Sequence, residues 1–251
     1  MVSDIKPLSH LHEYYKEGNY YKCKICSKKI LQYSVDKNGL KVGMRSNGRK
    51  LTKKANKNRF FFPDEWTKFE DKLKVNSRHS CKCLLHTGAR WMEMNKTQVS
   101  DFIHIPNGRS RLTLRHTKSK ARKGEFQFSE GRVRDLPISK SFSKYLQHCV
   151  IEYGLTPEDT FEILSKPGLN IAMKKAAVNA GLEHPEDFSP HNLRKTLEVW
   201  LMALGVDSMK LLAHFGHDMN TAAIHYVSPD IFSWEDKKKI RIIIGDLYED
   251  R

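Results

Sequence analysis

The clearest helical pattern along the chain covers residues 189–205, SPHNLRKTLEVWLMALG. Apolar side chains recur there at the spacing of a helix with one buried face, namely Leu193, Leu197, Trp200, Leu201 and Leu204. Ser189 is a suitable N-cap and Gly205 a suitable C-terminal stop. The segment therefore predicts a helix that carries His191 and Arg194 next to each other on a different face.

Shorter helices are predicted after this one. Residues 207–215, DSMKLLAHF, have Asp207 as an N-cap and Gly216 as a stop. A further helix begins near Asn220 and carries Tyr226 in its last turn, before a Ser-Pro pair that ends it. These helices place a glycine turn and one tyrosine close together in the sequence.

A different pattern covers residues 111–139, where apolar and polar positions alternate across Gly124 and Gly131. Alternation with period two predicts a small antiparallel sheet with a basic turn. Helical patterns precede this region, beginning at Pro63, and dominate from Lys140 onward. The fold class is therefore mainly α with one small antiparallel β-sheet (α+β).

The net charge of the chain indicates what kind of partner it binds. The 251 residues include 44 Lys and Arg against 29 Asp and Glu, a formal net charge of +15. Residues 1–58 contain 14 basic and 4 acidic residues, so the N-terminal quarter carries most of the excess. A chain this basic usually binds a polyanion, and nucleic acid is the first candidate, against the alternative of a solvated basic surface without a partner.

Cysteine usage and hydropathy bear on the compartment. The five cysteines are an odd number without a secretory framework, which favours a reducing environment. No apolar run approaches the length of a membrane span, and the N-terminus lacks the apolar core of a signal peptide. We expect an intracellular protein, cytoplasmic or associated with the nucleoid, with no membrane partner.

Three regions follow from these patterns. Residues 1–58 form a basic arm or a small DNA-binding module, residues 59–228 the main domain, and residues 229–251 a tail. Cys23 and Cys26 are half of a zinc-knuckle signature, so structural zinc is one alternative and two reduced cysteines the other. The tail predicts a helix capped by Ser233, with an apolar surface that packs on its own core or docks on a neighbouring protomer.

The residues of the main domain suit chemistry on a phosphodiester. Displacement at phosphorus concentrates negative charge on oxygens that arginines clamp in bidentate fashion. Arg90 and Arg194 are candidates for this clamp, with His191 and His217 near them in the sequence. Tyr226 is a candidate nucleophile, and a lysine of the turn TKSKARK a candidate proton donor to the leaving oxygen.

In the order and spacing of these residues, the chain resembles the tyrosine recombinases of the phage integrase family. The family's first box is similar to TGARWME, with Arg90 and Glu93, and the second to HNLRKT, with His191 and Arg194. The third is similar to HFGHDMNTAAIHY, which holds His217 and Tyr226 at the family spacing. Of the lysines before the "RxxPL"-like VRDLPIS, Lys118 fits best, with Lys120 and Lys123 as rivals.

The resemblance implies a tyrosine-recombinase catalytic domain and a mechanism. In it Tyr226 attacks a DNA phosphate, forms a 3′-phosphotyrosyl bond and releases a 5′-hydroxyl. Arg90, Arg194 and His217 hold the phosphate, His191 takes part in proton transfer from the tyrosine, and Lys118 protonates the leaving oxygen. Neither a metal nor ATP is required. The implied partners are double-stranded DNA and further copies of the chain, from dimer to tetramer, and the implied source is a mobile genetic element such as a virus or plasmid.

Two departures and three alternatives accompany this interpretation. Lys195 stands where many members have a histidine, and the region before Phe60 is too short for the usual core-binding domain. A type IB topoisomerase shares the chemistry, and a non-catalytic DNA-binding protein could share the scaffold. A metallohydrolase would use the following residues: His214, His217 and His225. The DNA target, and the choice between integration, excision and dimer resolution, stay open.

Overall fold

The computed structural model describes residues 14–17, 20–25, 27, 29–31, 59–106, 109–115, 133–216 and 231–248. The chain divides into two compact units, Met1–Asn56 and Lys57–Arg251. None of the helices in these described ranges combines the length and the apolar character that crossing a membrane requires.

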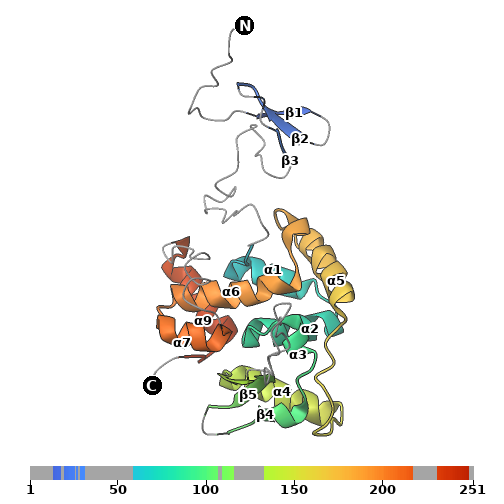
Figure 1. The fold of residues 1–251 in the computed structure, drawn as a ribbon, viewed down its shortest axis with the longest axis vertical. Helices are drawn as coiled ribbons and strands as arrows, with labels where there is room; N and C mark the ends of the chain where they lie inside the picture. The colour runs from blue at the N-terminus through green and yellow to red at the C-terminus, as the bar shows by residue number, and fades with distance from the viewer. Residues whose placement is uncertain are drawn as a thin grey trace, which may run out of the picture. The chain divides into compact units, whose positions relative to one another are not determined.

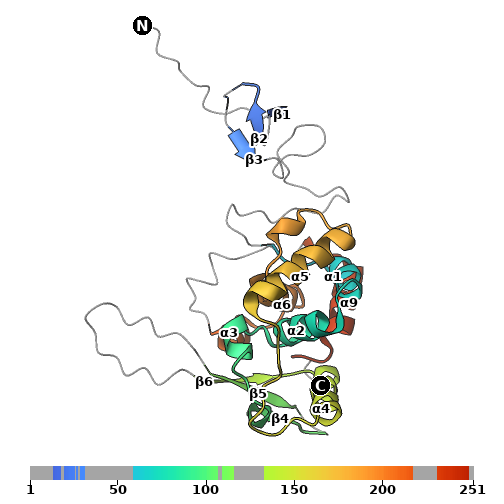
Figure 2. The ribbon, with the colours of Figure 1, turned by 90° about the vertical axis from the view of Figure 1, so that its right-hand side faces the viewer.

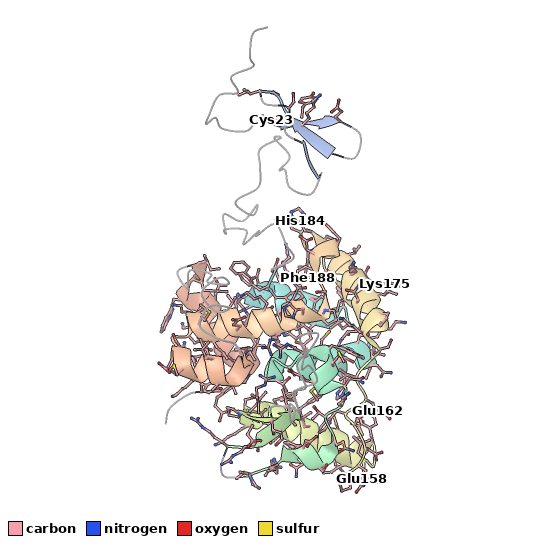
Figure 3. The ribbon with its side chains drawn as sticks, viewed as in Figure 1. Cys23, Glu158, Glu162, Lys175, His184 and Phe188 are labelled. Atoms are coloured by element: carbon pink, nitrogen blue, oxygen red, sulfur yellow. The ribbon has the colours of Figure 1, made fainter. Side chains whose placement is uncertain are left out.

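The first unit contains a three-stranded antiparallel sheet of order β1-β2-β3. Its strands are β1 (Tyr14–Glu17), β2 (Tyr20–Cys23) and β3 (Lys29–Leu31). Cys23, labelled in Figure 3, ends β2 with its side chain buried, and the backbone N–H of Ile25 donates to its Sγ at 3.4 Å. The second cysteine of the zinc hypothesis, Cys26, lies outside the described residues.

The second unit is mainly helical with a small antiparallel sheet, which confirms the predicted fold class (Figure 1). Its helices are α1 (Pro63–Asp71), α2 (Val75–Thr87), α3 (Trp91–Met94), α4 (Lys140–Glu152), α5 (Lys166–Asn179), α6 (Pro190–Ala203), α7 (Ser208–Phe215) and α9 (Trp234–Ile244). Its strands are β4 (Phe102–Ile103), β5 (Arg111–Arg115) and β6 (Val133–Pro137).

The sheet of this unit has the order β4-β5-β6 and lies beside α4 and below α2 in Figure 2. Leu112 pairs with Leu136 and Leu114 with Arg134 in the antiparallel register of β5 and β6. Leu112, Leu114 and Leu136 are buried, as the period-two alternation predicts. The strand β4 is absent from the sequence prediction, because two residues are too few to show an alternation.

The predicted ends of α6 and α7 are confirmed. Gly205 follows α6 with φ of 80°, and Gly216 follows α7 with φ of 59°, both in the left-handed region that favours glycine. The Asp207 carboxylate accepts hydrogen bonds from the first turn of α7, at 2.9 Å from Met209 N and 3.2 Å from Lys210 N. These local signals fix where the two helices that carry the second and third motifs begin and end.

The sequence predicts a single buried face on α6, but the structure buries more of the helix than that face. The helix packs against α2, α5, α7 and α9, and most of its residues are buried on every side (Figure 1). The segment before α1 covers the polar side: the Phe61 N–H donates to Thr196 Oγ1 at 3.0 Å, and Trp200 Nε1 donates to the Phe61 carbonyl at 2.9 Å. Phe61 also stacks on Phe188, which Figure 3 labels beside α6, with ring centroids 4.3 Å apart.

The tail forms the predicted helix, α9. Ser233 and Asp236 make a reciprocal cap, in which each backbone N–H donates to the other side chain at 3.1 Å. Ile240 and Ile244 are fully buried where α9 packs against α1 and α6 of its own chain. Docking of this segment on a neighbouring protomer stays a prediction.

Candidate active site

The first motif residues, Arg90 and Glu93, meet at the start of α3. Arg90 is the N-cap of α3, and its backbone N–H donates to Glu93 Oε2 at 2.8 Å. Its Nη1 donates to Glu93 Oε1, also at 2.8 Å. Glu93 is buried, whereas 35% of the Arg90 side chain is exposed. Arg90 is therefore held at its base and still presents a charged surface to solvent.

Gly88 makes the turn that leads into this motif. It ends α2 with φ of 60°, and a Cβ atom there would lie 2.5 Å from Phe215 Cε1 and 3.1 Å from Leu197 Cδ2. The side chains of Phe215 and Leu197 thus pack against the Gly88 backbone only because this residue has no side chain.

We expect Gly88→Ala to lower the free energy of unfolding by about 2–4 kcal/mol, as the sum of left-handed strain and overpacking. Gly181→Ala is the matched control, because Gly181 has φ of 64° and a Cβ atom added there would meet nothing within 4 Å. Urea unfolding of both variants measures the difference. Equal losses in the two variants would contradict a tight contact between Gly88 and Phe215.

Arg194 comes to the same place from α6. Its Nη1 donates to the Gly88 carbonyl at 2.7 Å and lies 4.0 Å from Glu93 Oε2. Its Nη2 donates to the carbonyl of Phe215, the last residue of α7. The side chain is 2% exposed. The structure therefore brings together Arg90 and Arg194, which lie about one hundred residues apart in the sequence.

Arg134, a residue without a predicted role, joins this cluster from β6. Its Nη2 donates to Glu93 Oε2 at 2.8 Å, and its Nη1 donates to the His214 carbonyl at 2.5 Å. The signal that could have found it is the arginine of the VRDLPIS motif.

The charges of the cluster are unbalanced. Burial alone would raise the pKa of Glu93, but the charge of Arg134 and the hydrogen bonds from Arg90 outweigh burial and hold this pKa below its usual value. Burial, and then the charges of Arg90 and Arg134, lower the pKa of Arg194 to about 9, so its guanidinium stays protonated at neutral pH. In the described part of the chain, three guanidinium groups thus face the Glu93 carboxylate, and this excess of positive charge suits an anion.

His214 supports the cluster in its neutral form. Its Nε2 faces the Thr87 carbonyl at 3.0 Å and its Nδ1 the Tyr248 hydroxyl at 2.8 Å. A carbonyl only accepts, so Nε2 carries the proton and Nδ1 accepts from Tyr248. Burial lowers the pKa of His214 to about 3. Because both ring nitrogens are engaged, the hypothesis of a metal site that includes His214 is wrong for this structure.

His191 lies one turn before Arg194, at the start of α6, with its side chain exposed. It lines a surface hollow of about 510 Å³ together with residues of α5 and the segment before α6, including Lys166, Asn170 and Lys174. The hollow therefore joins His191 to two lysines, whereas Arg194 is buried and does not line it.

The remaining predicted site residues lie outside the described residues: Lys118 with its rivals Lys120 and Lys123, His217, His225 and Tyr226. Across the described ranges, no group of three His, Cys, Asp or Glu side chains is arranged to hold a metal ion. The roles of these residues stay predictions.

Comparison with known sequences identifies the family. Residues 62–231 match the sequence profile of the phage integrase family, which is more than half of the chain. The chain therefore belongs to the phage integrase family, whose members are tyrosine recombinases. No curated protein is significantly similar to the chain over its sequence.

Solved structures support the same fold. The XerH site-specific recombinase bound to its difH substrate superposes with a TM-score of 0.52 and 19% identity, over 82% of this chain and 60% of that chain. The Tn1549 transposon integrase in complex with transposon right-end DNA gives a TM-score of 0.55 and 15% identity, over 77% and 68% of the two chains. The chain thus spans about 60% of the length of XerH, and the likeness concerns the fold of the catalytic domain.

Proposed function

We propose that this chain is a site-specific DNA recombinase that cuts and rejoins DNA through a 3′-phosphotyrosyl intermediate. The observation that carries the proposal is the cluster of Arg90, Arg134 and Arg194 around Glu93, with its excess positive charge and the partly exposed Arg90. Membership of the tyrosine recombinase family supports it, because these enzymes break and rejoin DNA.

The proposed cleavage step conserves the energy of the phosphodiester. The Tyr226 oxygen attacks phosphorus, a bond to the 5′ oxygen breaks, and a proton from Lys118 makes that oxygen a hydroxyl. A tyrosine has a usual pKa near 10, so His191 and the surrounding positive charge assist loss of its proton. Arg90, Arg194 and His217 stabilise the charge that develops on the phosphate oxygens. No metal or ATP enters the step, because the covalent link stores the energy for rejoining.

The proposed partners are double-stranded DNA and further copies of the chain. The XerH and Tn1549 integrase structures contain DNA, and we extend that partner to this chain by its family. Recombination exchanges strands between two duplexes, so we expect two to four copies on DNA. As part of the same proposal, the chain is encoded by a mobile genetic element such as a virus or plasmid.

The basic N-terminal unit is proposed to add phosphate contacts. Residues 1–58 hold 14 basic residues against 4 acidic ones, which favours DNA, and the N–H···S contact at Cys23 is compatible with a structural zinc bound by Cys23 and Cys26. We keep the zinc as part of this proposal and assign it no catalytic step.

We expect deletion of residues 1–58 to weaken DNA binding and to flatten its salt dependence, since each lost phosphate contact lowers the log–log slope by about 0.9. Affinity measured over a range of salt concentrations tests this. Unfolding in urea serves as the control, because the second unit contains its own core. An unchanged slope in a folded deletion variant would show that the N-terminal unit makes no phosphate contacts.

Covalent trapping tests the proposed function itself. A pool of duplexes with randomised sequence, each nicked a few nucleotides from one end, lets cleavage release a short 5′-hydroxyl strand and leaves the protein attached. The proposal predicts an SDS-resistant adduct that forms equally well in EDTA. A relaxed plasmid without strand exchange between two sites would favour the topoisomerase alternative, and DNA binding without any adduct would favour the non-catalytic one.

A further inference from the structure

Arg134 connects the Glu93 carboxylate to the end of α7. Its Nη2 donates to Glu93 Oε2 at 2.8 Å, and its Nη1 donates to the carbonyl of His214 in the last turn of α7. Its side chain is only 10% exposed. One planar guanidinium therefore fixes the distance between the carboxylate and the end of a helix.

The stem of Arg134 also lies against the turn that follows α7. A Cβ atom on Gly216 would be 3.0 Å from Arg134 Cδ and 3.3 Å from its Nε. Gly216 has φ of 59°, and the proposed phosphate ligand His217 is the next residue in the sequence. The backbone that leads to His217 thus leaves α7 in contact with Arg134.

The end of α7 is held by two arginines at once. Arg134 bonds the carbonyl of His214 and Arg194 the carbonyl of Phe215, which are among the carbonyls left unpaired at a helix C-terminus. Both guanidinium groups also face Glu93. A shift of Arg134 would therefore change the position of Glu93, of the α7 terminus, and through them of Arg90 and Arg194.

The charge of Arg134 also acts on Glu93. Among the described residues, the charged groups that face this carboxylate are Arg90 from α3, Arg134 from β6 and Arg194 from α6. Glu198 of α6 also acts on Arg194, and the neutral His214 of α7 lies beside Arg134 and Arg194. Burial alone would raise the pKa of Glu93, and Arg134 is the largest of the influences that lower it. Loss of Arg134 should therefore raise the pKa of Glu93.

We propose that Arg134 is a positioning residue for DNA cleavage: it locks Glu93 to the end of α7, so that Arg90 and Arg194 reach the DNA phosphate in one arrangement. This inference rests on the proposed function of the site. Both Nη atoms of Arg134 bond protein groups whose positions matter to the site, Glu93 Oε2 and the His214 carbonyl, and its stem lies against Gly216, so we assign it a role that acts through these residues.

The test compares Arg134→Gln, Arg134→Lys and the control Arg111→Gln in the full chain. Arg111 lies on the neighbouring strand β5 and is exposed, so its variant removes the same charge without these contacts. The measurements are the single-turnover rate of adduct formation at saturating nicked DNA between pH 4 and 9, DNA affinity, and unfolding in urea.

For Arg134→Gln we expect affinity close to wild type and a cleavage rate about 100-fold lower, the cost of misplacing reacting groups by about 1 Å. The acid limb of the pH profile should also move to higher pH, because Glu93 has lost an adjacent opposite charge and its pKa rises. Arg134→Lys should return the acid limb to its wild-type position and leave the rate low, since one ammonium cannot bond both Glu93 and the His214 carbonyl. Arg111→Gln should match wild type.

Three results would overturn the inference. Arg134→Gln could cleave at the wild-type rate with an unchanged pH profile. The cleavage rate of the variants could fall only as much as their folded fraction falls, with Arg134→Lys fully active. That result is expected for a residue that only stabilises the fold. A wild-type protein that binds DNA and forms no adduct would overturn the proposed function as well, whereas the first two results leave that function intact.

Discussion

Arg194→Ala is expected to slow DNA cleavage about a thousandfold while lowering DNA affinity far less, because the charge that Arg194 stabilises develops in the transition state. Arg194 is held by the carbonyls of Gly88 and Phe215 close to Glu93, so its guanidinium is oriented before the DNA arrives. Single-turnover cleavage and DNA affinity, measured separately on the same nicked duplex, test this expectation.

Lys195→Ala is the matched control for Arg194→Ala. Lys195 is the next residue of α6, is 5% exposed, and its Nζ lies 3.4 Å from Glu198 Oε2. Its loss removes a buried cation from the same helix and should lower stability without changing the cleavage step. If Arg194→Ala does not fold, Arg194→Lys is measured in its place, because lysine keeps the charge and loses the two contacts of the planar guanidinium. Equal losses of binding and cleavage would show Arg194 to be a simple phosphate anchor.

Tyr226→Phe is expected to bind DNA like the wild type and to form no covalent adduct. The substitution removes only the hydroxyl oxygen that the proposed mechanism uses as the nucleophile. The control is Tyr153→Phe, which removes a hydroxyl from a tyrosine that is 60% exposed at the end of α4. An SDS-resistant protein–DNA band that persists in Tyr226→Phe would rule out this tyrosine as the nucleophile.

The sequence predicts those parts of the site that local signals encode. Caps and glycine stops locate the ends of α6 and α7, and the motif TGARWME contains both Arg90 and the carboxylate that holds it. These features depend on residues within a few positions of each other, where side chains and backbone interact directly.

Local sequence signals do not predict contacts between residues that are far apart in the sequence. The alternation along β6 shows which side chains share a face, but not that Arg134 reaches Glu93 and the end of α7. The contact between His214 and Tyr248 joins α7 to the turn that follows α9, and the two segments share no local pattern. The periodicity of α6 predicts one buried face, and Phe61 covers the polar side through bonds that only the packed chain shows.

The most direct test of the central claim is to identify the residue to which DNA becomes covalently attached. Wild-type protein is trapped on the nicked duplex pool, the adduct is digested with protease and nuclease, and the modified peptide is sequenced by mass spectrometry. The account predicts a nucleotide joined through its 3′ phosphate to the Tyr226 oxygen, in the peptide that follows His217. A nucleotide on another residue, a 5′ linkage, or no adduct from folded protein that binds DNA would contradict it.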